Sequence, residues 1–457
     1  MDTARADAFE PWGAAPGTTP TVAQMARQGG RSQVRSTANW TVPGHGSMFS
    51  GEMPRTLGLG QVRGDSMSCA NQIAAVRDRW LPEVLRANGY ATAAVSANLW
   101  ISAQSGFDAG FDHFEHVDSD RLTMMADPGL RARLGWARQG MQARSDDGAR
   151  AAEACLAGWI DQGQHQPFFW FVNLTECHSP YLPPRPFNDL SWWRRLRVAD
   201  EARTHLTLEA IWKTSLGVRQ MPESALQGMR HLYGASVAAM DAWMGRLLER
   251  LERASLLSDT IVIVTSDHGE NLGECGLIGH CFSLDDRLLH VPFVTSWADF
   301  PDVASLADLP RALAETIGLV DHPWAPSPFP PGIAVAQMEA LASRGASQGV
   351  IELWGLDERA VARMTTSSTC AVEGQLKLVR RDDGQQEIFR LDLDPLEATP
   401  LEDPTSSADQ GSLARLRSAI ELADQHISAA VHTAAEHGSD EDEAARIARK
   451  MRELGYL

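Results

Sequence analysis

Apolar residues along this chain occur in two patterns, and the two patterns alternate. Short apolar runs at residues 167–173, 260–265 and 291–296 have the length and the β-branched or aromatic content of buried strands. Residues 223–253 instead show apolar positions at helical spacing. These positions are Tyr233, Val237, Met240, Met244, Leu247, Leu248 and Leu251. Buried strands that alternate with amphipathic helices predict a protein of the α/β class.

The strand predicted at residues 260–265 ends abruptly in polar residues, because Asp267, His268 and Gly269 follow it. Binding sites in open α/β sheets form at the carboxyl ends of strands. Gly269 permits a turn that brings both neighbouring side chains to one ion. A carboxylate with an imidazole suits zinc or manganese better than an ion that seeks only oxygen. The alternative is that Asp267 caps the next helix and that His268 is an ordinary loop histidine.

Two further segments carry candidate chemistry. Pro43 can occupy the first turn of a short helix, which places Thr41 just ahead of the helix amino end, where free N–H groups favour an anion. The strand predicted at residues 167–173 is followed by polar residues that include His178. Residues 185–220 contain Trp and Arg without clear periodicity, and we expect them to form an insertion over the site.

The bulk composition narrows the classes of function. The chain has 457 residues, of which 44% are hydrophobic and 22% are charged, as is typical of a soluble globular protein. This length allows two or three domains, or one large α/β unit with an appendage. A net charge of -18 without a long basic run makes nucleic acids and anionic membrane surfaces poor partners. An acidic protein that acts on an anionic substrate needs local positive charge, which a bound metal can supply.

The cysteines and the apolar runs bear on the compartment. Six cysteines are scattered without a C-x-x-C pair, which indicates a reducing environment. No apolar run approaches the ~18 residues of a membrane span, and no basic-then-apolar signal opens the chain. We therefore predict a cytoplasmic protein without a membrane span.

Composition also suggests domain limits. The Pro-rich passage at 321–332 suits a domain boundary. We predict a catalytic domain at residues 1–335, a small C-terminal subdomain at 336–400 with an antiparallel hairpin through Asp383–Gly384, and a charged helical tail at 401–457.

Several motifs then resemble, in order, the landmarks of a known family. They are Asp2-Thr3-x-Arg5-x-Asp7, Thr41-x-Pro43-Gly44-His45 with Ser50-Gly51, Gly106-Phe107-Asp108-Ala109-Gly110-Phe111-Asp112, Glu176-x-His178-x-Pro180-Tyr181, Ser266-Asp267-His268-Gly269-Glu270 and Asp392-x-Asp394-Pro395-x-Glu397. Together they resemble the sulfatase family of the alkaline phosphatase superfamily over nearly the whole chain. The resemblance implies a large mixed sheet with helices on both faces, followed by a small C-terminal α+β subdomain.

The resemblance also implies roles for individual residues. The implied metal ligands are Asp2, Thr41, Asp267 and His268, and Thr41 is also the implied nucleophile. His178 and His280 are implied to contact the substrate oxyanion or to protonate the leaving group, and His45 lies where the family carries a substrate-site arginine. We expect one divalent metal ion, zinc or manganese in preference to calcium or magnesium, and a small anionic ester as substrate.

Two departures from the family pattern change the expected chemistry. The sulfatase nucleophile is a formylglycine made from Cys or Ser, which Thr41 cannot form because its Cβ carries a methyl group. His45 replaces the arginine that helps to hold the modified residue. We therefore expect cleavage of a phosphate or phosphonate ester, as in the phosphodiesterases of the superfamily. The alternatives are a sulfatase that uses the unmodified hydroxyl and a non-catalytic sulfatase-like binding protein.

The amino end differs from the family as well. A short apolar strand precedes the first ligand acid in the family, whereas here that acid is Asp2. We expect Met1 to be an internal methionine of that strand, with the true start of translation upstream.

Overall fold

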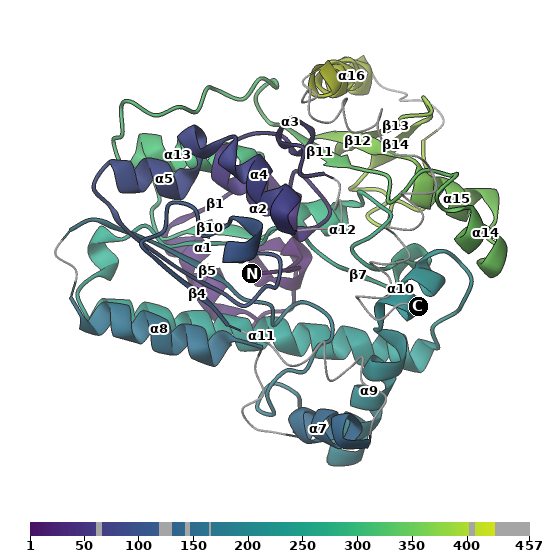
Figure 1. The fold of residues 1–457 in the computed structure, drawn as a ribbon, viewed down its shortest axis with the longest axis horizontal. Helices are drawn as coiled ribbons and strands as arrows, with labels where there is room; N and C mark the ends of the chain where they lie inside the picture. Colours follow the sequence, from purple (N-terminus) through teal and green to yellow (C-terminus); the bar gives the residue numbers. More distant parts are fainter. Residues whose placement is uncertain (61–65, 118–129, 142–146, 164–165, 402–406, 426–457) are drawn as a thin grey trace.

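The computed structural model describes residues 1–60, 66–117, 130–141, 147–163, 166–401 and 407–425. Strands form a central layer, with helices above and below it in the view of Figure 1. This arrangement confirms the predicted α/β class.

The central layer contains two three-stranded sheets. The first is parallel, in the order β4-β3-β5, and consists of His113–His116, Ala91–Ser96 and Phe168–Asn173. The second is antiparallel, in the order β1-β10-β6, and consists of Gly30–Arg31, Phe293–Thr295 and Ile263–Thr265. Two short antiparallel pairs accompany them: β2 with β9, Val34–Arg35 and His290–Val291, and β7 with β8, Asn271–Leu272 and Ile278–Gly279.

Residues 1 and 2 connect the two sheets through their backbone. The amino group of Met1 donates to the carbonyl oxygen of Thr265 at the end of β6 (2.8 Å), and the N–H of Asp267 donates to the carbonyl oxygen of Met1 (3.4 Å). On the other side, the N–H of Asp2 donates to the carbonyl oxygen of Leu174, just after β5 (2.9 Å). Asp2 therefore lies between the carboxyl ends of strands from both sheets.

Helices cover both faces of the central layer, and a separate apolar core lies under the helices of each face. Helices α1, α8 and α11, Pro20–Gln28, Ala149–Asp161 and Glu223–Arg253, pack over one core that includes Val22, Leu156 and Met240. On the opposite face, a second core includes Phe49, Ile73, Leu85 and Leu313. It lies under α2, α4, α5 and α13, which are Thr41–Ser50, Ser66–Ala74, Leu81–Ala87 and Leu309–Thr316.

Residues 185–220 are more regular than their sequence suggested. They contain α9, Trp192–His205, and α10, Leu208–Ser215, and α9 packs against α7, Leu130–Met141. The periodicity of α9 is weak because its buried face includes the charged Arg195 beside the small Ala199 and Ala202, while Trp192 is 62% exposed. The hydroxyl of Ser215 donates to the carbonyl oxygen of Ile278 (3.1 Å), so this insertion contacts the segment that leads to His280.

A separate antiparallel sheet follows the Pro-rich passage. Strands β11 to β14 pair in chain order and are Ile333–Met338, Ser368–Glu373, Leu376–Arg381 and Gln386–Arg390. Helix α16, Ser407–Gln425, packs its apolar face on this sheet through Leu413, Leu416 and Ile420. The structure has the hairpin through Asp383–Gly384 between β13 and β14. The three domain limits given above stay a prediction, and residues 426–457 of the expected tail lie outside the described residues.

The remaining helices are short connections. They are α3, Pro54–Leu57, α12, Asp286–Leu289, α14, Gln348–Trp354, and α15, Glu358–Thr365. None of the helices in the described ranges combines the length and the apolar character needed to cross a bilayer.

Candidate metal centre and nucleophile

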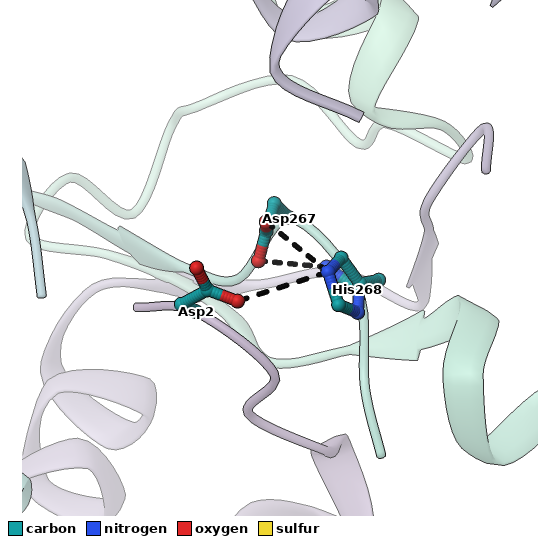
Figure 2. Close-up of side chains that lie close together, drawn as sticks. All are labelled: Asp2, Asp267 and His268. Carbon is teal, nitrogen blue, oxygen red and sulfur yellow. Dashed lines mark hydrogen bonds and ion pairs between the residues drawn. The ribbon is translucent and has the colours of Figure 1, made fainter. Parts of the chain in front are cut away.

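Three of the four predicted metal ligands lie together in the structure. Ligand atoms of Asp2, Asp267 and His268 are all within 4.8 Å of one another, and all three residues are buried. Nε2 of His268 is 3.7 Å from Oδ1 of Asp2 and 3.4 Å from Oδ2 of Asp267. Figure 2 shows both carboxylates directed at the imidazole. Two acids and a histidine from opposite ends of the catalytic sequence therefore converge as the resemblance implied.

The turn after β6 is held by close backbone contacts that require glycine. A Cβ on Gly44 would lie 2.9 Å from the carbonyl oxygen of Asp267, so glycine lets α2 approach this turn. A Cβ on Gly269 would lie 2.0 Å from the carbonyl oxygen of Arg287, which no side chain could tolerate without a backbone shift. The hydroxyl of Ser36 also donates to the carbonyl oxygen of Asp267. The backbone at Asp267 and His268 is therefore fixed from several sides.

The hydrogen bonds of His268 prepare one of its nitrogens for a cation. Nδ1 donates to the carbonyl oxygen of Gly269 (2.9 Å), so Nδ1 carries a proton. Nε2 faces the two carboxylates. A backbone acceptor for the far ring nitrogen is the usual arrangement of a metal-binding histidine.

The carboxylates of Asp2 and Asp267 each have an oxygen that could accept a further bond. Oδ1 of Asp2 and Oδ2 of Asp267 are buried and have no hydrogen-bond partner. Burial and the nearby charge of Asp267 raise the pKa of Asp2 above its usual range. Burial alone would raise the pKa of Asp267 too, but His268 and His45 outweigh it and hold this pKa below the usual value. Two buried carboxylates beside an imidazole nitrogen fit a divalent cation, which would neutralise them and fill the open bonds.

Thr41 lies at the edge of this cluster. Its hydroxyl is 3.4 Å from Nε2 of His268, and Thr41 is the first residue of α2. The preceding residue, Trp40, makes no side-chain cap, so the positive end of the helix dipole faces the site without a capping oxygen. A hydroxyl beside a cation site at a helix amino end is well placed to meet an anionic group.

His45 is one helical turn after Thr41, and both of its nitrogens contact protein groups. Nδ1 donates to the carbonyl oxygen of Thr41 (2.9 Å) and lies 3.4 Å from Oδ2 of Asp267. The side-chain amide of Asn173 lies 3.3 Å from Nε2. The ring also meets the edges of Phe107 and Phe171. The predicted substrate contact of His45 stays a prediction.

His178 and His280 lie beside the cluster and differ in their protonation. The ring centroid of His280 lies 4.6 Å from the ring centroid of His268 and 5.5 Å from that of His178. Burial lowers the pKa of His178, but the carboxylates of Asp2 and Glu270 more than compensate and raise it. Burial, together with His268 and His178, holds the pKa of His280 well below its usual value. One histidine therefore favours the charged form and the other the neutral form.

Some residues at the site were assigned no role from the sequence. Glu270 is fully buried, and one of its oxygens accepts a hydrogen bond from the hydroxyl of Tyr181 (2.9 Å). The amide of Asn98 donates to Oδ2 of Asp2. Asn173 is the last residue of β5, and Asn98 follows the last residue of β3 by two positions. A polar residue just at or after the end of an apolar run was the available signal.

Fold and site together give an α/β protein with a candidate metal centre at the carboxyl ends of its strands. The family model described as Sulfatase matches residues 1–303. The chain belongs to the sulfatase family.

Curated relatives support this assignment. The chain is 28% identical over 228 residues to arylsulfatase K of Mus musculus, which covers 46% of this chain and 38% of the relative. It is 25% identical over 287 residues to choline-sulfatase of Rhizobium meliloti (strain 1021), which covers 56% of this chain and 51% of the relative. The matches thus span about half or less of the length of these relatives.

Solved structures share the fold over nearly the whole chain. The phosphonate monoester hydrolase of Agrobacterium radiobacter superposes with a TM-score of 0.63 at 16% identity and covers 93% of this chain and 94% of its own. A 2-O GAG sulfatase superposes with a TM-score of 0.61 at 14% identity and covers 92% of this chain and 89% of its own. At these identities the likeness concerns the fold alone.

Proposed function

We propose that this protein hydrolyses a small phosphate or phosphonate ester, with Thr41 as a covalent nucleophile beside one divalent metal ion. The observation that carries the proposal is the position of the Thr41 hydroxyl, 3.4 Å from Nε2 of His268, the nitrogen that faces two buried carboxylate oxygens without hydrogen-bond partners. Asp2, Asp267 and His268 would hold the ion, with Thr41 as a further ligand. Zinc or manganese suits this mixed oxygen and nitrogen set better than calcium or magnesium.

A bound cation would supply the positive charge that stabilises the alkoxide of Thr41 and the anionic group of the substrate. The oxygen of Thr41 attacks the phosphorus, forms an ester with it and displaces the alcohol of the substrate. Water then attacks the phosphorus of this ester and gives its proton to a base, and phosphate or phosphonate is released. The oxygen of Thr41 takes up a proton from the solvent, which replaces the one that the hydroxyl lost to the solvent before its attack. The amino end of α2 contributes partial positive charge to the same place.

The two flanking histidines divide the proton transfers. His178 has a raised pKa and is the donor that protonates the departing alcohol. His280 has a lowered pKa and an unpartnered Nδ1, so it is the base that accepts a proton from the attacking water. Neighbouring groups whose surroundings move their pKa values apart are a common basis for such a division.

Two considerations favour phosphorus over sulfur. A threonine cannot be converted into the formylglycine of sulfatases, so the unmodified hydroxyl must serve. Two of the similar folds are phosphonate monoester hydrolases, one from Agrobacterium radiobacter and one from Silicibacter pomeroyi. The names of the curated relatives favour sulfate-ester hydrolysis as the second candidate.

Parallel assays test the proposal. Aryl phosphate, aryl phosphate diester, aryl phosphonate ester and aryl sulfate are offered to the metal-loaded protein and to Thr41→Ala, Thr41→Ser and the exposed control Thr204→Ala. We expect phosphorus esters to be cleaved by the wild type, by Thr204→Ala and more slowly by Thr41→Ser, but not by Thr41→Ala.

Other outcomes assign the alternatives. Cleavage of the sulfate alone, lost in Thr41→Ala, would replace the proposal with a sulfatase. Absence of bound metal and of activity on every ester, after zinc or manganese has been added, would favour a binding protein.

A further inference from the structure

An ion pair that is removed from solvent joins the C-terminal sheet to the segment that follows its last strand. Nζ of Lys377, on β13, lies 2.5 Å from Oε2 of Glu397, and the two side chains are 0% and 1% exposed. Lys377 also donates to the carbonyl oxygen of Leu284, which belongs to the catalytic part of the chain. We call Lys377 and Glu397 the latch.

Stability alone does not explain the latch. The cost of removing two charges from water offsets most of their attraction, so a buried ion pair contributes little net stability compared with apolar side chains of similar size. A buried pair does restrict geometry, because an ammonium group has three donors and a carboxylate has several acceptor sites that must all be satisfied. The partners of the latch therefore indicate what it orients.

Those partners lie at the start of α12. The second oxygen of Glu397, Oε1, accepts a hydrogen bond from the N–H of Asp286, the first residue of α12. Together with the bond from Lys377 to Leu284, this fixes the segment that enters the helix. Arg287 adds a bond in the same direction, since its Nη1 donates to the carbonyl oxygen of Pro395 (3.2 Å).

The far end of α12 contacts the candidate metal centre. The carbonyl oxygen of Leu288 accepts from the N–H of Gly269 (2.7 Å), the residue after His268. The carbonyl oxygen of Leu289 accepts from the N–H of Ser36 (2.7 Å), whose hydroxyl in turn donates to the carbonyl oxygen of Asp267. One short helix thus supports the backbone of two candidate ligands.

We propose that the latch of Lys377 and Glu397 is a positioning device for the metal centre. It holds α12 in place, and α12 fixes the backbone at Asp267 and His268 at the spacing that a cation needs. The inference rests on the proposed function for the presence of the metal, and it makes the C-terminal sheet a part of the catalytic apparatus that touches neither metal nor substrate.

The test compares the full chain with three variants. Lys377→Met removes the charge and both hydrogen bonds of the lysine, whereas Glu397→Gln keeps an oxygen for the N–H of Asp286. Leu416→Ala is the matched control, because Leu416 is fully buried in the core between α16 and the same sheet. It destabilises the subdomain without contact to the latch.

Two measurements are made on each protein below its unfolding transition. The first is the dissociation constant for Zn²⁺ or Mn²⁺, which we expect to rise about tenfold in Lys377→Met, as for changes to the supporting residues of metal sites. Glu397→Gln should give a smaller rise in the dissociation constant. Leu416→Ala should give no rise, even where it lowers the thermal stability as much as Lys377→Met does. The second is amide hydrogen exchange of the metal-free protein, in which Gly269 and Ser36 should exchange faster in Lys377→Met than in Leu416→Ala.

Failure of this inference differs from failure of the proposed function. If the wild type binds metal and Lys377→Met binds it no more weakly than Leu416→Ala does, the positioning role is wrong. If the wild type binds no metal, the proposed function fails, and equal exchange at Gly269 in the two variants would then refute the latch as well. Should Lys377→Met not fold, Glu397→Gln carries the same comparison, and an affinity and exchange equal to wild type would overturn the inference.

Discussion

The hydroxyl of Thr41 lies 3.4 Å from Nε2 of His268, although 227 positions separate the two residues. The contact joins the first residue of α2 to the turn after β6. Because the same nitrogen faces Asp2 and Asp267, the hydroxyl belongs to one cluster with both carboxylates. On this contact depends the proposal that Thr41 reacts at the metal centre.

The buried carboxylate of Asp2 should destabilise the metal-free protein but stabilise the protein when metal is bound. Burial and the charge of Asp267 raise the pKa of Asp2, so its ionised form destabilises the metal-free fold near neutral pH. We expect Asp2→Asn to raise the melting temperature of the metal-free protein. Metal at 100 times its dissociation constant should stabilise the wild type by about 2.7 kcal/mol, and the variant by much less.

Calorimetric melting curves with and without Mn²⁺ measure both effects. Asp299→Asn, at an exposed carboxylate, is the control that should change neither. A variant that melts lower than wild type without metal would contradict the electrostatic account of the site.

Much of this site follows from the sequence, because its residues end apolar runs. Asp267 and His268 follow the run that forms β6, and the fold then brings Asp2 to the same edge. Thr41 carried no such signal of its own beyond Pro43 in a predicted helix turn, and the resemblance supplied its role.

Other contacts were beyond the sequence because they join segments whose packing no local pattern encodes. Lys377 lies between two apolar residues of its strand, at a position that would ordinarily face solvent. It is nevertheless fully buried and donates to the carbonyl oxygen of Leu284. Likewise, the buried face of α9 gave no periodic signal, since it includes the charged Arg195, whereas the large apolar residues Trp192 and Trp193 are exposed.

The backbone contact at Gly269 predicts a large effect of a small substitution. A methyl group there would lie 2.0 Å from the carbonyl oxygen of Arg287, so Gly269→Ala should cost about 3 kcal/mol of unfolding free energy and weaken metal binding. Gly234→Ala, in the middle of α11 with no atom within 4 Å of the new carbon, should instead add about 1 kcal/mol. Urea unfolding of both variants tests this, and equal stability would refute the close packing at the turn.

The lowered pKa of Asp286 predicts that the free energy of unfolding falls at acid pH. Burial would raise its pKa, but Arg35 outweighs that effect and lowers the pKa to about 2. Because the folded value lies below the unfolded value, the stabilisation is present above the unfolded pKa and is lost as the pH falls toward 2. The difference in unfolding free energy between wild type and Asp286→Asn should therefore shrink by about 1 kcal/mol between pH 5 and pH 3. Urea titrations at both pH values measure it, and a constant difference would show that the Arg35 contact does not depend on the charge of Asp286.

The raised pKa of His178 predicts how the reaction depends on the leaving group. The raised pKa keeps the imidazole charged to higher pH than usual, so it can protonate a departing alkoxide, which matters most for poor leaving groups. His178→Gln should lower kcat about 10²- to 10⁴-fold for a phenyl or alkyl ester, but far less for a nitrophenyl ester, whose phenolate leaves without a proton. The exposed control His113→Gln should leave both rates unchanged. An equal loss for the two classes of ester would assign His178 to binding the oxyanion rather than to proton donation, since an oxyanion contact stabilises both transition states alike.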